Sequence, residues 1–304
     1  MWVQFYRGNR SSLADKLSEK RINIVIPAYN EDQAVGNQIE SILSVMNRTD
    51  WDYRIIMVND GSTDETLHEI QKFDVDIINK SENHGYGEAL KSGIREADSE
   101  FILITDADGT YPSDIIPELL SKIEEYDMVV GSRTGEKVHI PLLRKPAKYF
   151  LRLLSSYLTG IEIPDLNSGL RVMRKSVVEK YYAILPSGFS FTTTITIASL
   201  CDGYRVHYHP INYANRVGNS KIRPVDTFHF LILILKAMIR FRPLKFFIPL
   251  GLAFLIAGFL NLQISVSSSS NSAVFWFCMA ASFLSIALGF YSNRLVQFRL
   301  NQTF

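Results

Sequence analysis

Residues 246–293, near the carboxyl end of this 304-residue chain, form an uninterrupted run without Asp, Glu, Lys, Arg or His. The run contains two apolar stretches, Phe246–Ile264 and Ala273–Tyr291, separated by a short turn rich in serine. A helix of about 19 residues is about 28 Å long, close to the roughly 30 Å thickness of the hydrocarbon layer of a membrane. The run therefore predicts a two-helix transmembrane hairpin, in preference to two helices buried in a soluble core.

The charges around this run predict how the hairpin is oriented. The turn has no basic residue, whereas basic residues flank the run on both sides: Arg240, Arg242 and Lys245 before it, and Arg294 and Arg299 after it. Because basic residues accumulate on the cytoplasmic side of membranes, we expect both termini and the large amino-terminal part in the cytoplasm. Just before the run, residues 227–245 mix apolar and basic side chains and predict an amphipathic helix at the membrane interface.

Composition narrows the remaining possibilities. The chain has 32 Lys and Arg against 31 Asp and Glu, a formal net charge of +1, which argues against a bulk electrostatic binder of nucleic acid. Its two cysteines, Cys201 and Cys278, cannot build a disulfide framework or a cysteine-based zinc site. Such sparse cysteine usage suits a reducing compartment.

The amino-terminal part alternates strand-like and helix-like patterns. Short apolar runs predict strands at 22–27, 54–58, 75–78, 101–104 and 128–130. Helical patterns lie between them, over about 32–45 and 64–73 and in a segment opened by Gly85-Tyr86-Gly87. Near-continuous apolar strands separated by helices indicate an α/β fold with a mostly parallel sheet covered by helices. In such sheets ligands bind beyond the carboxyl ends of the strands.

Acidic residues follow two of these strands. Asp60 comes after the second strand, and Asp106 and Asp108 come after the fourth. Two carboxylates at this spacing can face one cation where the chain bends, and hard oxygen ligands suit Mg²⁺ or Mn²⁺ whose other positions are filled by phosphate and water. The dipeptide Asp108-Gly109 is also typical of turns, so the two aspartates on their own could equally mark an ordinary turn.

Three other patterns leave two interpretations open. Ser62 and Asp64 favour a helix N-cap over a ligand role. Gly85-Tyr86-Gly87 either opens a helix or lets the backbone approach a nucleotide, and it lacks the spacing of the dinucleotide fingerprint. His207 and His209 share one face of a predicted strand, and ordinary strand histidines are favoured over a metal site.

The motifs at the strand ends occur in a defined order. Pro27-Ala28-Tyr29-Asn30-Glu31, Asn59-Asp60-Gly61-Ser62 and Asp106-Ala107-Asp108 follow the first, second and fourth strands. This set resembles family 2 glycosyltransferases of the GT-A fold, which use nucleotide-sugar donors. The downstream segments 165–171, 190–194 and 216–221 are similar to the branch that uses polyprenyl phosphates, which includes the dolichol-phosphate mannose synthases. The resemblance covers about residues 22–221, and the paired apolar stretches match its membrane-anchored members.

On the donor side, the resemblance implies a role for each matching residue. A base and ribose pocket would be lined by Pro27, Tyr29 and Glu31, and Asp60 would accept hydrogen bonds from the uracil or guanine edge. The donor diphosphate would be bound through Mg²⁺ or Mn²⁺ on Asp106 and Asp108. Thr110 stands where many mannose synthases carry Gln, which leaves the third metal contact open and favours a UDP-sugar over GDP-mannose.

On the acceptor side, the resemblance implies that Arg171 and Lys221 contact phosphate oxygens, with Arg216 and Ser220 nearby. The catalytic residues would then be Asp108, Arg171 and Lys221. A phosphate monoester has a second pKa of about 6 and is mostly a dianion at neutral pH, so it needs positioning and charge compensation rather than a general base. We therefore expect direct displacement with inversion at the anomeric carbon.

Together these inferences predict the organisation of the chain. A polar extension (1–20) precedes a GT-A domain (21–226), which is followed by the interfacial helix (227–245), the hairpin (246–293) and a cytoplasmic tail (294–304). The expected activity is transfer of a hexose from a nucleotide-diphosphate sugar to a dolichyl or undecaprenyl phosphate at the cytoplasmic membrane face.

Two other functions and a homo-oligomer are further possibilities for a chain of this kind. A processive polysaccharide synthase of the same fold would carry a Gln-x-x-Arg-Trp motif and more spans, and the sequence has neither. A non-catalytic membrane scaffold would have no reason to keep Asp60, Asp106, Asp108 and Arg171 together. Small residues in both apolar stretches, such as Gly251, Gly258 and Gly289, could pack against other copies of the chain, so a homo-oligomer is a further expectation.

Overall fold

The computed structural model describes residues 20–135, 145–214, 224–264 and 270–301. It divides into two compact units. The first unit comprises Met1–Pro141, Pro164–Ile195 and Tyr204–Lys221, and the second comprises Leu142–Ile163, Thr196–Gly203 and Ile222–Phe304. The expected division at residue 226 is therefore not the one that the contacts give, because residues 142–163 and 196–203 belong with the carboxyl-terminal helices.

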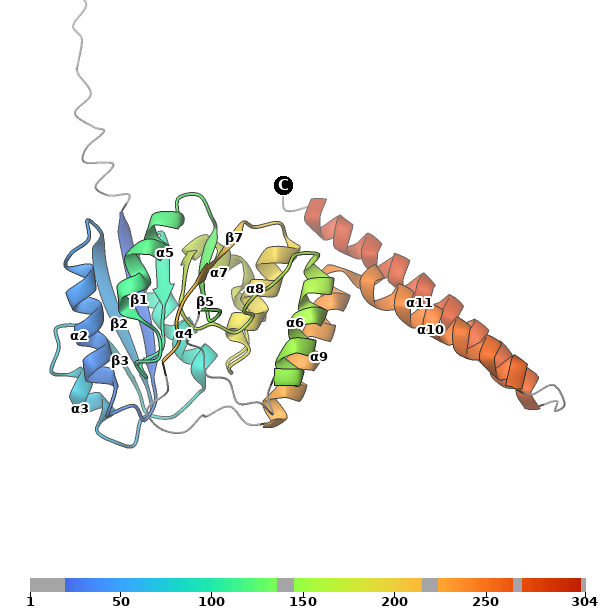
Figure 1. The fold of residues 1–304 in the computed structure, drawn as a ribbon, viewed down its shortest axis with the longest axis horizontal. Helices are drawn as coiled ribbons and strands as arrows, with labels where there is room; N and C mark the ends of the chain where they lie inside the picture. Colours follow the sequence, from blue (N-terminus) through green and yellow to red (C-terminus); the bar gives the residue numbers. More distant parts are fainter. Residues whose placement is uncertain (1–19, 136–144, 215–223, 265–269, 302–304) are drawn as a thin grey trace, which may run out of the picture. The chain divides into compact units, whose positions relative to one another are not determined.

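A sheet of seven strands, counted over the described residues, forms the centre of the first unit (Figure 1). Its order is β3-β2-β1-β4-β6-β5-β7, with β1 Arg21–Ala28, β2 Asp52–Asp60, β3 Asp76–Lys80, β4 Phe101–Ile104, β5 Met128–Ser132, β6 Arg171–Arg174 and β7 Val206–Pro210. Neighbouring strands are parallel except that β6 is antiparallel to both β4 and β5. The prediction of a mostly parallel sheet is confirmed.

Helices cover both faces of this sheet. On one face, Ile22, Ile24 and Ile26 of β1 belong to the apolar core that α2 (Val35–Met46) and α5 (Ile116–Lys122) complete. On the other face, α4 (Tyr86–Glu96) packs so closely that a Cβ on Gly93 would lie 2.4 Å from Val25. Two short helices, α3 (Thr66–Ile70) and α7 (Lys175–Tyr181), follow strands β2 and β6. Burial on both faces explains why β1 is apolar along almost its whole length.

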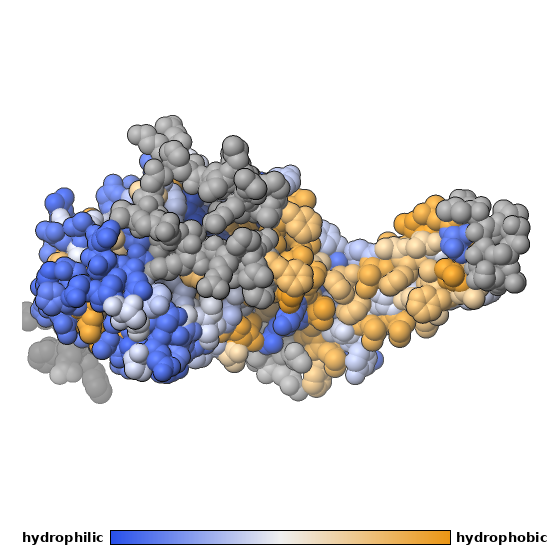
Figure 2. Space-filling model, turned by 90° about the horizontal axis from the view of Figure 1, so that it is seen from below, coloured by the Kyte–Doolittle hydropathy of each residue, from blue (hydrophilic) through white to orange (hydrophobic). Residues whose placement is uncertain are grey.

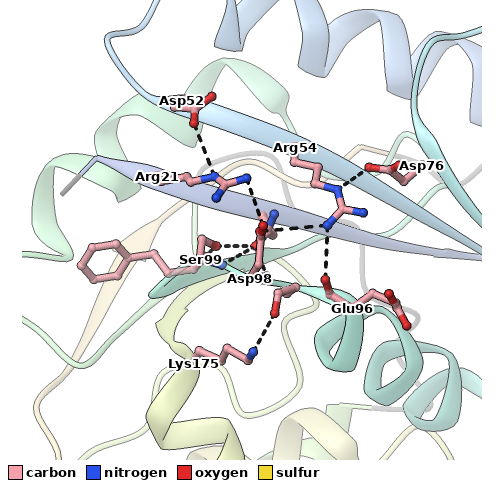
Figure 3. Close-up of polar contacts among 11 residues, drawn as sticks. Arg21, Asp52, Arg54, Asp76, Glu96, Asp98, Ser99 and Lys175 are labelled. Carbon is pink, nitrogen blue, oxygen red and sulfur yellow. Dashed lines mark hydrogen bonds and ion pairs between the residues drawn. The ribbon is translucent and has the colours of Figure 1, made fainter. Parts of the chain in front are cut away.

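Polar contacts fix the edge of the sheet at which β1 and β2 begin (Figure 3). Arg21 pairs with Asp52 and Asp98, and Arg54 pairs with Asp76. The buried amide oxygen of Asn23 accepts hydrogen bonds from the backbone N–H groups of Asp98 and Ser99 at 2.9 and 2.8 Å and from the Ser99 hydroxyl. These contacts tie the connection between α4 and β4 to the start of the sheet, at the edge opposite the acidic loops.

The second unit contains the two apolar helices that the sequence predicts as a hairpin. The helices α10 (Pro243–Ile264) and α11 (Ser270–Asn301) run side by side (Figure 1). Within the described residues, both are long and apolar enough to cross a membrane. Large side chains remain exposed along them, including Trp276 (67%), Phe277 (70%) and Phe283 (77%), and hydrophobic atoms dominate the visible surface of the pair (Figure 2). A soluble helix pair would bury such side chains, so this surface fits a transmembrane hairpin.

Small residues bring the two helices together. A Cβ on Gly251 would lie 2.7 Å from Ile286, and a Cβ on Gly289 would lie 2.8 Å from Phe247. Gly258 likewise faces Cys278. These glycines are therefore used inside the hairpin, and the expected homo-oligomer gains no support from them.

Two more helices complete the second unit, α6 (Lys145–Thr159) and α9 (Pro224–Phe241), and they pack against each other. The predicted amphipathic segment corresponds largely to α9, where Phe230, Ile234 and Met238 lie one turn apart and are buried, while Lys236 is exposed. Part of the apolar stripe is thus covered within the unit. A further helix, α8 (Phe191–Cys201), has residues in both units.

Two of the basic residues before the hairpin bind the carboxyl ends of other helices. The Lys245 ammonium donates to the carbonyls of Tyr157 (2.7 Å) and Leu158 (3.1 Å) at the end of α6, and Arg242 donates to the carbonyl of Cys201 (3.0 Å) at the end of α8. In return, the Tyr157 hydroxyl donates to the Lys245 carbonyl at 3.2 Å. That carbonyl lacks its usual helical partner because Pro249, four residues on, has no N–H.

Replacing Lys245 by Met should destabilise the second unit by about 1–2 kcal/mol, because two terminal carbonyls of α6 lose a charged donor. We expect a lower thermal unfolding midpoint for the detergent-solubilised protein. Lys236→Met, which removes an exposed ammonium from α9, is the matched control and should leave the midpoint unchanged. Equal midpoints for both variants would show that the helix-end contacts of Lys245 do not contribute.

Candidate active site

The loops that follow β1, β2 and β4 meet at one edge of the sheet, because these three strands are parallel. The antiparallel strand β6 starts at the same edge, where Arg171 pairs with Ile104 at the end of β4. This brings the loop 165–170 beside the acidic pair. A Cβ on Gly169 would lie 2.7 Å from the Asp106 carboxylate, so no larger residue fits there without a shift. The Tyr111 hydroxyl accepts a hydrogen bond from the Gly169 N–H at 2.6 Å.

The two aspartates after β4 are held by different neighbours. Asp106 is half-buried, and its Oδ1 accepts a hydrogen bond from the Tyr86 hydroxyl at 2.8 Å. Asp108 is buried, and its Oδ1 accepts hydrogen bonds from the Thr110 N–H at 3.1 Å and the Thr110 hydroxyl at 2.6 Å. The residue that replaces the Gln of many mannose synthases therefore orients the second aspartate.

The donor set of this pair fits a divalent cation such as Mg²⁺ or Mn²⁺. Both candidate ligands are carboxylates on one short loop, and hard oxygen ligands are what these ions prefer. Among the described residues, no cluster of three or more His, Cys, Asp or Glu side chains is arranged to hold a metal. A cation on Asp106 and Asp108 would therefore need further oxygens from phosphate or water, which is the usual condition of Mg²⁺ in nucleotide sites.

The segment Gly85-Tyr86-Gly87 opens α4, which is one of its two predicted roles. The backbone of residues 186–188 lies close to this segment, so that a Cβ on Gly87 would lie 2.1 Å from the Pro186 carbonyl oxygen. The Tyr86 ring stacks on Phe189 with 5.7 Å between ring centroids. Burial, reinforced by the nearby Asp106 charge, holds the pKa of Tyr86 well above its usual range, so the phenol keeps its proton and donates.

The loops after β1 and β2 are joined by hydrogen bonds. The Asn30 N–H donates to the Ser62 hydroxyl at 3.0 Å, and the Glu31 N–H donates to the Thr66 hydroxyl at 2.8 Å. The Asp64 carboxylate accepts from the Thr66 N–H at 3.0 Å, but the N-cap of α3 is Glu65, whose side chain makes no capping hydrogen bond, so the N-cap interpretation of Ser62 and Asp64 is wrong.

The donor-side residues occupy these same loops. Pro27 is buried within β1, whereas Tyr29 and Glu31 are half-buried beyond its end. Asp60 is only 2% exposed, and its carboxylate accepts from the Gly85 N–H at 2.8 Å and pairs with Lys80 at 3.2 Å. Asp60 therefore fixes the turn before α4, and its contact with a nucleobase stays a prediction.

Arg171 is completely buried at the start of β6. Its Nε donates to the Ser168 carbonyl at 3.2 Å, and its Nη1 donates to the Thr192 carbonyl at 3.3 Å. Burial lowers the pKa of this guanidinium. The structure thus places Arg171 beneath the loops at the site rather than at an open surface, and its expected contact with the acceptor phosphate stays a prediction.

An ion pair that the sequence analysis did not identify lies at the start of the loop 165–170. Arg133, directly after β5, donates to the Asp165 carboxylate through Nε at 2.7 Å and Nη2 at 2.8 Å. Burial alone would raise the pKa of Asp165, but the charge and hydrogen bonds of Arg133 lower it to about 2. The guanidinium also lies 5.2 Å from the centroid of the Tyr213 ring. Arg133 could have been found by asking which polar residue follows the fifth predicted strand.

Three of the predicted acceptor-side residues, Arg216, Ser220 and Lys221, lie outside the described residues. The described chain before them ends at Ala214, whose N–H donates to the Thr110 carbonyl at 3.1 Å. His209 lies 3.2 Å from Glu118, and His207 packs on Tyr126. Contacts of this kind with a carboxylate and an aromatic ring are those that ordinary strand histidines make, which is the interpretation that the sequence favours.

The fold is that of a GT-A glycosyltransferase. Glucosyl-3-phosphoglycerate synthase from Mycobacterium tuberculosis, solved with Mn²⁺, UDP and phosphoglyceric acid, superposes with a TM-score of 0.58 at 17% identity, over 72% of this chain and 78% of that one. The model of the glycosyl transferase family 2 matches residues 23–182. The chain belongs to this family, as the motif order predicts.

The similarity to curated relatives covers more residues of the chain than the family model matches. The dolichyl-phosphate hexose transferase of Haloferax volcanii is 30% identical over 204 residues, which cover 66% of this chain and 86% of that protein. The dodecaprenyl-phosphate galacturonate synthase of Rhizobium johnstonii is 28% identical over 251 residues, covering 78% of this chain and 73% of that protein. The similarity to the polyprenyl-phosphate branch of the family is thereby confirmed.

Proposed function

We propose that the chain transfers a hexose from a nucleotide-diphosphate sugar to a polyprenyl phosphate, dolichyl or undecaprenyl, and so forms a polyprenyl-phosphate sugar. The observation that carries the proposal is that one chain combines the Asp106 and Asp108 pair at the edge of a GT-A sheet with two exposed apolar helices of membrane-spanning length. The named lipid acceptors of the two curated relatives support the same class of substrate.

On the donor side, Asp106 and Asp108 would hold Mg²⁺ or Mn²⁺, which neutralises the charge of the departing diphosphate. Residues of the first two loops, Tyr29, Glu31 and Asp60, would contact the nucleotide, with Pro27 fixing the end of β1. We favour a UDP-sugar over GDP-mannose because Thr110 orients Asp108 where mannose synthases carry Gln. The UDP-bound structural neighbour supports this preference for a uridine nucleotide.

On the acceptor side, the phosphate dianion would attack the anomeric carbon directly, with inversion and without a general base. The nearby carboxylate of Asp165 would be a poor base, since its pKa is about 2 and Arg133 occupies both of its oxygens. Charge compensation would come from Lys221 and Arg216, with Ser220 as a further donor. Arg171 would act on the same phosphate, either by contact or by holding the Ser168 and Thr192 carbonyls.

A lipid acceptor requires the protein to work at a membrane surface. The helix α6 exposes the large apolar side chains Tyr149, Phe150, Leu153 and Tyr157, and tyrosine is enriched at membrane interfaces. The basic residues at both ends of the hairpin support a cytoplasmic location for both termini and for the catalytic part.

The test is an assay of membranes that contain the full chain with a panel of labelled UDP-sugars and GDP-mannose, with and without added polyprenyl phosphate. We expect label in a glycolipid with one UDP-sugar, loss of transfer in a chelator, and recovery with Mg²⁺ or Mn²⁺. Mass spectrometry of the lipid extract identifies the product. Label in a long polymer would indicate a processive synthase, and no transfer with any donor would indicate a non-catalytic scaffold.

A further inference from the structure

The Tyr86 hydroxyl reaches a candidate metal ligand from a different element of the fold. Tyr86 is the first residue of α4, whereas Asp106 follows β4, and the phenol donates to the Asp106 Oδ1 at 2.8 Å. The ring itself is fixed independently, since it stacks on Phe189 with an interplanar angle of 21°. The position of the phenol oxygen is therefore set by ring packing as well as by this hydrogen bond.

The backbone at Gly169 also restricts where the Asp106 carboxylate can lie. A Cβ on Gly169 would lie 2.7 Å from Oδ1 of Asp106, and the Gly169 N–H is held by the Tyr111 hydroxyl at 2.6 Å. The Asp106 carboxylate is therefore confined by the loop 165–170 and anchored by Tyr86. A ligand whose orientation is fixed in advance loses less conformational freedom when it binds a cation.

We propose that Tyr86 is a positioning residue for the divalent cation, because its hydroxyl sets the orientation in which Asp106 binds the metal. This inference rests on the proposed function, which gives Asp106 and Asp108 to Mg²⁺ or Mn²⁺. Hydrogen bonds to carboxylate ligands orient them, and their loss typically lowers metal affinity by about 10–100-fold. Tyr86 does not contact the donor or the acceptor in this role; it acts through Asp106.

The variant Tyr86→Phe isolates the hydroxyl. It keeps the ring and its stacking on Phe189, and it leaves the packing at the start of α4 unchanged. We expect the dissociation constant for Mn²⁺ to rise about 10-fold, as measured by the electron paramagnetic resonance signal of free Mn²⁺ over the detergent-solubilised full chain. Transfer should show the same shift in the Mn²⁺ concentration for half-maximal rate, and saturating Mn²⁺ should restore most of the rate.

Two control variants separate the hydroxyl from packing. Tyr208→Phe removes a buried phenol that has no hydrogen-bond partner among the described residues, and it should leave Mn²⁺ affinity unchanged. Phe189→Leu removes the stacked ring but leaves the phenol, and it should shift Mn²⁺ affinity less than Tyr86→Phe does. If Phe189→Leu weakens Mn²⁺ binding as much as Tyr86→Phe, packing rather than the hydrogen bond is responsible and the inference is overturned.

The variant Asp106→Asn distinguishes failure of this inference from failure of the proposed function. If wild type binds Mn²⁺, Asp106→Asn does not, and Tyr86→Phe binds like wild type, the inference is wrong while the metal role of Asp106 stands. If wild type and Asp106→Asn bind Mn²⁺ equally, the metal role itself is wrong, and the positioning role of Tyr86 falls with it.

Discussion

Replacing Asp108 by Asn is expected to reduce sugar transfer at least about 100-fold while leaving the protein folded. Asparagine keeps the oxygen that accepts hydrogen bonds from the Thr110 N–H and hydroxyl, so the turn after β4 keeps its geometry. It removes the negative charge that a divalent cation requires. The measurements are the initial rate of glycolipid formation and the thermal unfolding midpoint of the same preparation.

The matched control for this variant is Asp114→Asn, which removes an exposed carboxylate six positions further along the chain. Its rate should stay within a factor of about 2 of wild type, because surface charges away from a site have small effects. A rate for Asp108→Asn within a few-fold of wild type would remove Asp108 from the metal site.

Breaking the Arg133–Asp165 ion pair has the second largest expected effect. Asp165→Asn leaves the guanidinium of Arg133, whose side chain is 17% exposed, without its bidentate partner, and removing one member of a buried pair costs about 3–5 kcal/mol, which is the upper bound for this partly buried pair. The loop 165–170 should shift as well, because asparagine keeps one oxygen for the Arg133 side chain and the Asn167 N–H, and its amide NH₂ turns a further donor towards Arg133. We therefore expect both a fall of roughly 10 °C in the unfolding midpoint and a large loss of transfer.

A double-mutant cycle tests whether the pair itself is responsible. Arg133→Met combined with Asp165→Asn should destabilise less than the sum of the two single changes, because neither charge is then left unpaired. The half-exposed pair Arg54–Asp76 is the control, and Asp76→Ala should change stability by less than about 1 kcal/mol. Additive effects at Arg133 and Asp165 would show that the two side chains act separately.

The same pair predicts a dependence on pH. Asp165 has a pKa of about 2 in the fold, below its ordinary value of 3.8, so it stabilises the folded state fully above about pH 4. This contribution, roughly 2 kcal/mol, is lost as the pH falls from 4 towards 2. Wild type should therefore lose stability more steeply over that range than Asp165→Asn, as measured by unfolding at a series of pH values.

The sequence predicts the strands that are buried on both faces better than the others. Residues 101–104 are a continuous apolar run and residues 22–27 are apolar except for Asn23, and the observed strands β1 and β4 begin and end within one residue of them. The strand β6 gives no such signal, because its four residues, 171–174, include an arginine at each end. It becomes a strand by pairing with β4 and β5, which is a tertiary effect that no local pattern contains.

The candidate site likewise combines features that the sequence predicts with features that only the fold creates. Acidic residues at strand ends can be found from sequence, because loops after parallel strands converge at one edge. The burial of Arg171 cannot be found in this way, since an arginine is normally exposed, and the acceptors that satisfy it here, which include the Ser168 and Thr192 carbonyls, come from distant parts of the fold. The Tyr86 contact also joins residues from separate elements, and the spacing of Gly85-Tyr86-Gly87 does not indicate it.

The position of β6 between β4 and β5 imposes an order on folding during synthesis. The strands β1 to β4 can pair with one another as soon as residues 21–104 have left the ribosome, but β5 finds neighbours within the described residues only in β6 and β7. A chain leaves the ribosome amino terminus first, and non-local pairings form late. We therefore expect nascent chains that end before Arg171 to form only the β1–β4 part of the sheet. In these chains Asp106 has been synthesised, but Gly169 does not yet restrict its carboxylate.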